Sequence, residues 1–127
     1  MSSHSQQGVF ADLDPITFMN IVRKFRKDIN RQFCFSHRDL LEFLLIKALL
    51  TPINLLTEVN GAYETRVTQA TQRTATEIKI SWGAFDNTLK ISLVKIRFKN
   101  RKVLKEHKMV FDLKNIKKNY EDKLSLL

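Results

Sequence analysis

The chain has 127 residues, of which 43% are hydrophobic and only three are Gly and two are Pro. A chain of this length can bury about two thirds of its unfolded surface, so we expect a single domain that folds without disulfides or metal. The formal net charge is +9, from 22 Lys and Arg against 13 Asp and Glu, and such an excess favours polyanionic partners.

The cysteine count and the length of the apolar runs indicate the cellular compartment of the protein. Cys34 is the one cysteine, which excludes an intrachain disulfide and agrees with a reducing compartment. The N-terminus lacks the basic start and apolar stretch of a secretory signal. The most apolar run, 40–50, contains Glu42 and Lys47 and is far shorter than the roughly 20 residues that span a bilayer. We therefore expect an intracellular protein, cytoplasmic or nuclear, with no membrane partner.

The N-terminal half is helical in pattern. Small polar residues predict a disordered tail over 1–12, followed by a single α+β domain over 13–127. Asp14 and Pro15 mark a helix start, because Asp caps free N–H groups and Pro lacks the N–H that would be unpaired at the first position. Apolar residues at steps of three and four then predict an amphipathic helix of about 18 residues. This stripe consists of Phe18, Val22, Phe25, Ile29 and Phe33.

A second helix is predicted from Ser36, where Asp39 completes a capping-box-like arrangement, to the residue before Pro52. Its apolar side chains point in nearly every direction, so we expect it to be buried on several sides. It is either the central element of the core or part of a subunit interface. The ambiguous stretch 53–60 is assigned to a short helical turn that ends at Gly61.

After Gly61 the pattern alternates with a period of two, which predicts strands. Four strands are expected, around 63–67, 76–82, 89–98 and 103–113. In the third strand the apolar phase switches, which predicts either a bulge near Leu93 or burial of both faces at one end. Ile116, Tyr120 and Leu124 predict a short C-terminal helix. The fold class is therefore α+β, with two N-terminal helices packed on a four-stranded antiparallel meander and a short C-terminal helix.

The positive charge is concentrated in one segment. Between Lys90 and Lys118, eleven basic residues oppose two acidic ones, so this segment carries the whole net charge. Lys95, Arg97 and Lys99 alternate with apolar residues, which predicts a row of cations on one face of a strand. The alternative is a solvated sheet face whose lysines protect an edge from aggregation. The predicted nucleic-acid-binding residues are Lys95, Arg97, Lys99, Arg101, Lys102, Lys105, Lys108, Lys114, Lys117 and Lys118.

Other candidate features are weaker. The basic face of the first helix, which includes Arg23 and Lys27, is ordinary for an amphipathic helix. Aromatic side chains could stack on nucleobases, but periodicity assigns Trp82, Phe98 and Phe111 to the core. Phe85, in the loop 83–87, is the aromatic residue that we expect to be exposed.

Catalysis has little support in the sequence. The chain has no Gly-rich phosphate loop, no paired cysteine ligands and no His-x-x-x-His spacing, so no cofactor or metal is expected. Cys34 follows Phe33 and is interpreted as a packed thiol, because no motif here supplies a low-pKa environment. The three histidines, His4, His37 and His107, lie in unrelated contexts. We therefore do not expect an enzyme.

These patterns leave three hypotheses. The first is a non-enzymatic nucleic-acid-binding or nucleic-acid-associated module that uses the basic hairpin and C-terminal segment for backbone contacts. The alternative is a protein–protein adaptor subunit that forms homo- or hetero-oligomers through apolar helices and sheet, with the basic face docking an acidic protein. A small enzyme or ligand binder is the third. A contiguous exposed apolar patch favours the adaptor, a deep pocket favours the enzyme, and a continuous positive ridge without either favours nucleic acid.

Overall fold

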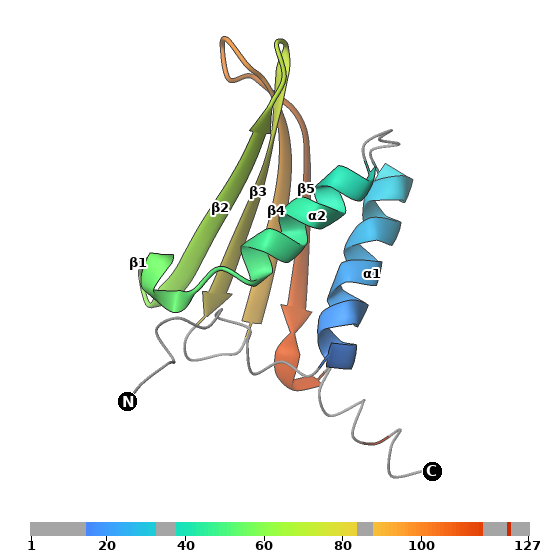
Figure 1. The fold of residues 1–127 in the computed structure, drawn as a ribbon, viewed down its shortest axis with the longest axis vertical. Coiled ribbons are helices and arrows are strands. Elements are labelled where there is room, and N and C mark those ends of the chain that lie inside the picture. The colour runs from blue at the N-terminus through green and yellow to red at the C-terminus, as the bar shows by residue number, and fades with distance from the viewer. Residues whose placement is uncertain (1–14, 33–37, 84–87, 116–121, 123–127) are drawn as a thin grey trace.

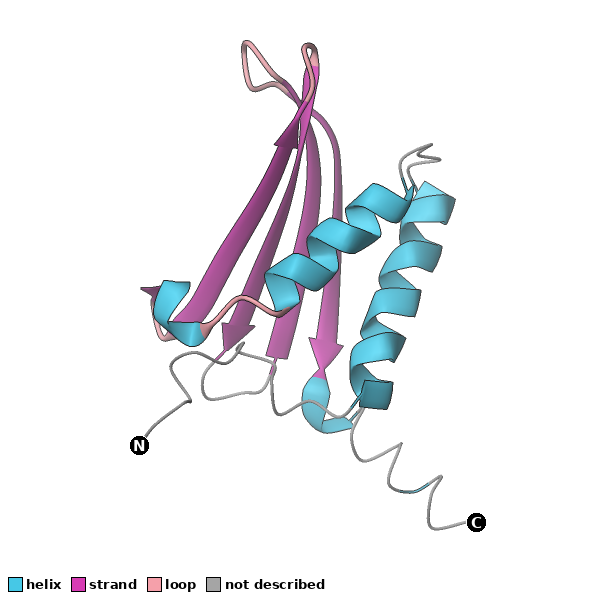
Figure 2. Cartoon of the chain, in the orientation of Figure 1, coloured by secondary structure: helices cyan, strands magenta, loops and turns pink. Residues whose placement is uncertain are grey.

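The computed structural model describes residues 15–32, 38–83, 88–115 and 122. Within them lie two α-helices, a short 3₁₀ helix and one five-stranded antiparallel sheet with the strands in chain order, so the α+β class is confirmed (Figure 2). The helices are α1 (Pro15–Gln32), α2 (Arg38–Leu49) and the 3₁₀ helix η2 (Ile53–Leu55). The strands are β1 (Thr57–Val59), β2 (Ala62–Ala70), β3 (Thr74–Gly83), β4 (Thr88–Arg97) and β5 (Val103–Asp112).

The prediction of four strands is wrong because it misses β1. Only Ile53–Leu55 of the stretch assigned to a helical turn is helical, and the chain then forms a hairpin in which Val59 pairs with Ala62. The two turn residues, Asn60 and Gly61, have φ values of 51° and 75°. An Asn-Gly pair with both φ values positive suits a two-residue hairpin turn. With three exposed residues, β1 is too short to produce an alternating pattern in the sequence.

Both helices cover the same face of the sheet (Figure 1). α2 crosses β2 and β3, whereas α1 lies beside β5. Two contacts join α1 to β5: Lys24 Nζ lies 4.9 Å from the centroid of the Phe111 ring, and His107 Nε2 lies 3.7 Å from a carboxylate oxygen of Asp28. The opposite face of the sheet has no layer over it among the described elements.

The core lies between this helix layer and the sheet. Val22, Phe25 and Leu44 are buried, as the apolar periodicity predicts, whereas Phe18 and Trp82 are half-buried at its margin. Burial of apolar area is the main favourable contribution to folding, so these side chains fix the helices on the sheet. The core residues are Ile21, Val22, Phe25, Ile29, Leu41, Leu44, Leu45, Ala48, Leu49, Ile78, Ile80, Leu89, Ile91, Leu93, Met109, Phe111 and Leu113.

The helix-facing side of β4 changes from apolar to charged along its length. Leu93 is buried and pairs with Ile78 of β3. Lys95, two residues further along β4, lies on the same side and pairs with Thr76, so the register between β3 and β4 is unbroken. A bulge near Leu93 is therefore wrong: the irregularity lies between Lys95 and Ile96, where Leu104 is the extra residue in β5. The other interpretation of the phase switch fits, since Ile96 is 4% exposed on the opposite side of the strand.

Some predictions fall partly or wholly outside the described residues: the tail over 1–12, the helix start at Ser36, the loop with Phe85, and most of the C-terminal helix. Among the described residues, 113–115 form one helical turn. Asp112 caps this turn by accepting hydrogen bonds from the backbone N–H groups of Lys114 (3.1 Å) and Asn115 (3.3 Å).

Replacing Phe25 with Ala tests the packing of the helix layer. Phe25 is fully buried between α1 and the sheet, so its truncation should lower the free energy of unfolding by about 3–5 kcal/mol. Urea unfolding followed by circular dichroism measures this change. An Ala variant as stable as the parent would contradict the placement of α1 on the sheet.

Candidate functional site

Two hairpin turns project beyond the helices, at the end of the sheet that is uppermost in Figure 1. One joins β2 to β3 and the other joins β4 to β5. They are tied together where the backbone N–H of Phe98 donates to the carbonyl oxygen of Arg73 at 2.8 Å. The pairing of β3 with β4 therefore brings residues 71–73 beside residues 98–102, although they are far apart in the sequence.

Hydrogen bonds within each turn fix its shape. In the β4–β5 turn, the N–H of Arg97 donates to Lys102 O and the N–H of Arg101 donates to Arg97 O, both at 2.8 Å. Arg101 adopts a φ of 55°, a conformation that is costly for a residue with a Cβ. In the β2–β3 turn, the hydroxyl oxygen of Thr71 accepts the N–H of Thr74 at 3.0 Å. Both turns are thus closed by local hydrogen bonds.

Five cations gather on these turns, and we call them the cationic tip: Arg73, Arg97, Lys99, Arg101 and Lys102. All five side chains are exposed. Arg101 forms an ion pair with Glu77, with 2.7 Å between Nη2 and Oε1. The other four form no ion pair with any residue that the structure describes. The cationic tip therefore keeps most of its charge uncompensated and attracts anions.

Phe98 lies within the cationic tip and is 50% exposed. The prediction that it belongs to the core is therefore wrong. Its apolar alternation with Arg97 and Lys99 suggested a buried side, but β4 ends at Arg97 and Phe98 belongs to the turn. A half-exposed ring between Arg97 and Lys99 in the sequence is a surface on which a nucleobase can stack.

The ten predicted binding residues do not form one row. Arg97, Lys99, Arg101 and Lys102 lie together in the cationic tip. Lys95 and Lys105 face each other across β4 and β5 on the helix-facing side, whereas Lys108 lies on the other side of the sheet and pairs with Glu106 at 3.2 Å. Lys114 follows the opposite end of β5, and Lys117 and Lys118 lie outside the described residues.

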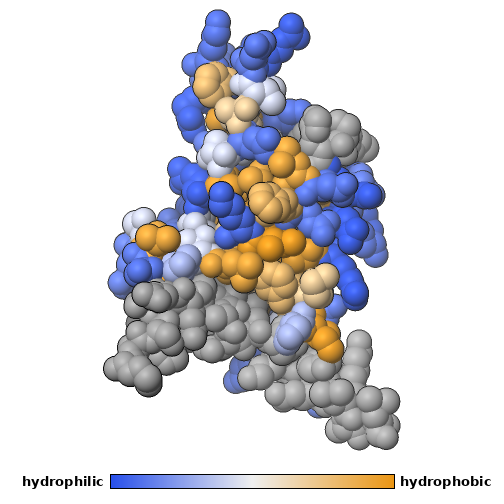
Figure 3. Space-filling model, viewed as in Figure 1, coloured by the Kyte–Doolittle hydropathy of each residue, from blue (hydrophilic) through white to orange (hydrophobic). Residues whose placement is uncertain are grey.

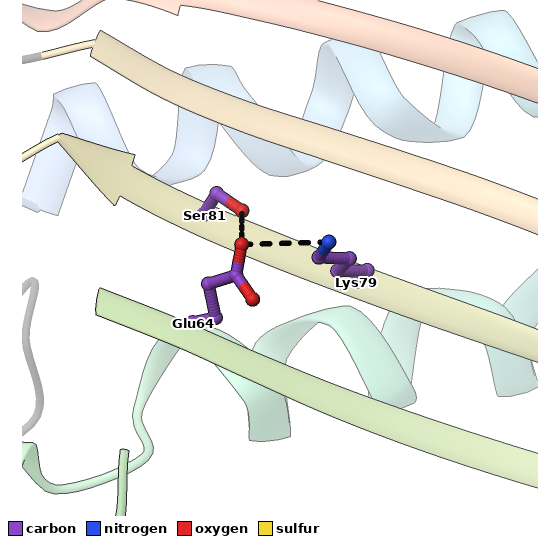
Figure 4. A network of polar contacts seen from close by, with 3 residues as sticks. All are labelled: Glu64, Lys79 and Ser81. Carbon is purple, nitrogen blue, oxygen red and sulfur yellow. Dashed lines mark hydrogen bonds and ion pairs between the residues drawn. The ribbon is translucent and has the colours of Figure 1, made fainter. Parts of the chain in front are cut away.

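The uncovered face of the sheet is polar, and part of its charge is neutralised by ion pairs. Figure 4 shows a network in its middle, in which one carboxylate oxygen of Glu64 accepts a hydrogen bond from Ser81 (3.1 Å) and pairs with Lys79 (3.4 Å). Nearer the cationic tip, the pair of Arg101 with Glu77 lies on the same face. Lys79, Lys108 and Arg101 on this face thus already have a carboxylate, so a phosphate gains less from them than from the unpaired cations of the cationic tip. Arg66 and Lys90 also lie on this face and form no ion pair with a described residue, but they are not gathered on one turn.

Groups that could perform chemistry are sparse in the described part of the chain. No three His, Cys, Asp or Glu side chains gather there in a way that could hold a metal ion. A hollow beside β1 and β2 contains one carboxylate, Glu64, which already bonds Lys79 and Ser81. His107 lies beside Asp28 under α1, whereas Cys34, His4 and His37 fall outside the described residues.

The helix layer has an exposed apolar outer face. The sequence predicts burial of α2 on several sides; instead α2 buries the side toward the sheet and exposes Leu40 and Phe43, and Leu50, directly after the helix, is also exposed. Figure 3 shows apolar surface gathered in the middle of this face of the molecule, with hydrophilic side chains on both sides of it. Among the described helices, none has the length and apolar composition that a membrane crossing requires.

No protein-family model, curated protein or solved structure matches this chain. From the sequence, four of the five cations of the cationic tip could be predicted, but Arg73 and the exposure of Phe98 could not. Arg73 lies outside the basic segment, in a turn that contains no other charged residue. Only the hairpin register, which places the two turns side by side, could have identified it.

Proposed function

We propose that this protein is a non-enzymatic nucleic-acid-binding module that contacts the phosphate backbone through the cationic tip. One observation carries the proposal: two turns that are hydrogen-bonded to each other carry a half-exposed phenyl ring and four exposed cations that have no carboxylate partner among the described residues. Preformed turns lose little conformational entropy on binding, so the charge is already arranged for a ligand.

The chemistry of the side chains suits nucleic acid. Arg73 and Arg97 carry planar guanidinium groups, which can donate two parallel hydrogen bonds to one phosphate. Neutralising phosphates with Lys and Arg also releases condensed counterions, which supplies affinity that does not depend on sequence. Phe98 adds a stacking surface for an unpaired base, which favours single strands over duplexes.

The combination of uncompensated cations with an exposed phenyl ring favours single-stranded nucleic acid as the ligand. An acidic protein could also meet the cations of the cationic tip, but a single strand offers a phosphate and a planar base at every nucleotide, which matches cations placed next to Phe98. Backbone contacts position a nucleic acid without reading its sequence, so binding should tolerate many sequences. The lysines away from the cationic tip contribute through the overall positive potential only.

Removing the charge of the cationic tip should abolish most of the binding. The variant replaces Arg73, Arg97, Lys99 and Lys102 with Gln, which removes little buried apolar area because all four side chains are exposed. If each cation meets one phosphate, the slope of log affinity against log salt concentration should fall by about 0.7 to 0.9 per residue. Fluorescence anisotropy with a random-sequence single strand, repeated over a range of salt concentrations, measures both quantities.

The matched control removes the same charge elsewhere, by replacing Arg23, Lys27, Lys90 and Lys114 with Gln. These residues are exposed and lie outside the cationic tip, so the control should retain most of the affinity. Equal losses in the two variants would mean that net charge, not the cationic tip, determines binding. A parent protein that fails to bind DNA or RNA at about 0.15 M salt would overturn the proposal and leave the adaptor hypothesis, which the apolar face of α2 favours.

Replacing Phe98 with Ala separates stacking from charge. The charge is unchanged, so the salt dependence should stay as in the parent protein, while affinity for a single strand falls by about 1–3 kcal/mol for each base that stacks. Affinity for a duplex should change much less, because its bases are already stacked on one another. Equal affinity of parent and variant for single strands would show that Phe98 does not contact the bases.

A further inference from the structure

The outer face of α2 is apolar at its centre and charged at both ends. Phe43 is 61% exposed and lies in the middle of the helix, with Leu40 and half-buried Ile46 one turn away on either side. At about 100° per residue, Phe43 points directly away from the side that holds Leu41, Leu45 and Ala48. An exposed phenyl ring at the centre of an apolar patch is typical of a protein-binding surface.

The residues around Phe43 repeat symmetrically in opposite directions along the helix. Leu40 and Ile46 lie three residues before and after it, and Asp39 and Lys47 lie four residues before and after it. When a second α2 helix runs antiparallel to the first with the two Phe43 residues opposite each other, Leu40 of one helix therefore faces Ile46 of the other. In the same arrangement Asp39 of one helix faces Lys47 of the other. Such a surface is complementary to itself in the antiparallel direction.

We propose that this face binds a second copy of the chain, with the two α2 helices antiparallel across a two-fold axis at Phe43. Phe43 then packs against Phe43 of the other copy, Leu40 against Ile46, and Asp39 against Lys47. A two-fold interface uses the same patch twice, so the Leu40–Ile46 and Asp39–Lys47 contacts each occur twice, whereas the Phe43–Phe43 contact on the axis occurs once. The two charge pairs lie about 12 Å apart along the helix, since the rise per residue is about 1.5 Å.

The charges that this arrangement needs are available. Asp39 and Lys47 are exposed and neither forms an ion pair with another described residue. The other acidic residue of α2, Glu42, is engaged within the molecule, where it pairs with Arg26 of α1 at 3.2 Å. A parallel pairing would instead bring like charges together, so the charge pattern selects the antiparallel direction.

The first experiment tests whether the outer face of α2 holds two copies together. Light scattering and analytical ultracentrifugation of the full chain, over a range of concentrations, should show a monomer–dimer equilibrium. Replacing Phe43 with Glu should abolish the dimer. The matched control replaces Val110 with Glu, because the Val110 side chain is as exposed as that of Phe43 (61%) but lies on β5. This control variant should dimerise like the parent.

The second experiment tests the antiparallel direction by exchanging charges. Asp39→Lys alone, or Lys47→Asp alone, turns two attractive contacts into two repulsive ones and should weaken dimerisation by about tenfold or more. The double variant Asp39→Lys with Lys47→Asp restores opposite charges and should return the dissociation constant to near that of the parent.

Each outcome decides the proposal. Recovery in the double variant supports the antiparallel dimer, because only an Asp39–Lys47 contact between copies predicts it. A monomeric parent at all concentrations overturns the dimer, as does a dimer that Phe43→Glu leaves intact. A dimer lost in Phe43→Glu but not rescued by the charge exchange would show that the face pairs in another orientation. None of these results depends on nucleic-acid binding, which is measured separately.

Discussion

The arrangement depends on one geometric constraint: a single layer of two helices covers one face of a sheet whose strands are longer than that layer. Strands of ten residues extend about 33 Å, whereas the 18 residues of α1 rise about 27 Å and the twelve residues of α2 about 18 Å. Apolar residues line the sheet where it lies under the helices, and the same side carries Lys95 and Arg97 where the strand passes beyond them. The projecting end can therefore hold charge without weakening the core.

The same constraint produces the two surfaces that we connect with function. No described helix lies over the ends of the hairpins (Figure 1), so their turns are free to carry the cationic tip. The helix layer has nothing described on its outer side, so the apolar face of α2 is open to another chain. Because these surfaces lie on different parts of the molecule, the presence of one does not argue against the other. A dimer through α2 would present two cationic tips, and linked sites raise the apparent affinity for a long polyanion.

The sequence predicts the regular elements well because long amphipathic patterns constrain them. The stripe through Phe25 predicts α1, and alternation predicts β2 to β5. The sequence fails where the environment of a residue depends on distant segments. β1 leaves no local pattern because three residues are too few to alternate. The change from apolar to charged residues along β4 depends on where the helices stop covering the sheet, which the sequence of β4 does not indicate. The site depends in the same way on the register of β3 with β4, which brings Arg73 to Phe98.

The central claim is that nucleic acid binds at the cationic tip, away from the helix layer. An NMR titration of the isotope-labelled chain with a short single-stranded oligonucleotide tests this most directly, because every backbone amide reports separately. We expect the largest shift changes over 71–74 and 97–102, with the amides of α2 nearly unaffected. Changes concentrated in α2 or on the uncovered face of the sheet, with the turns unmoved, would contradict the account.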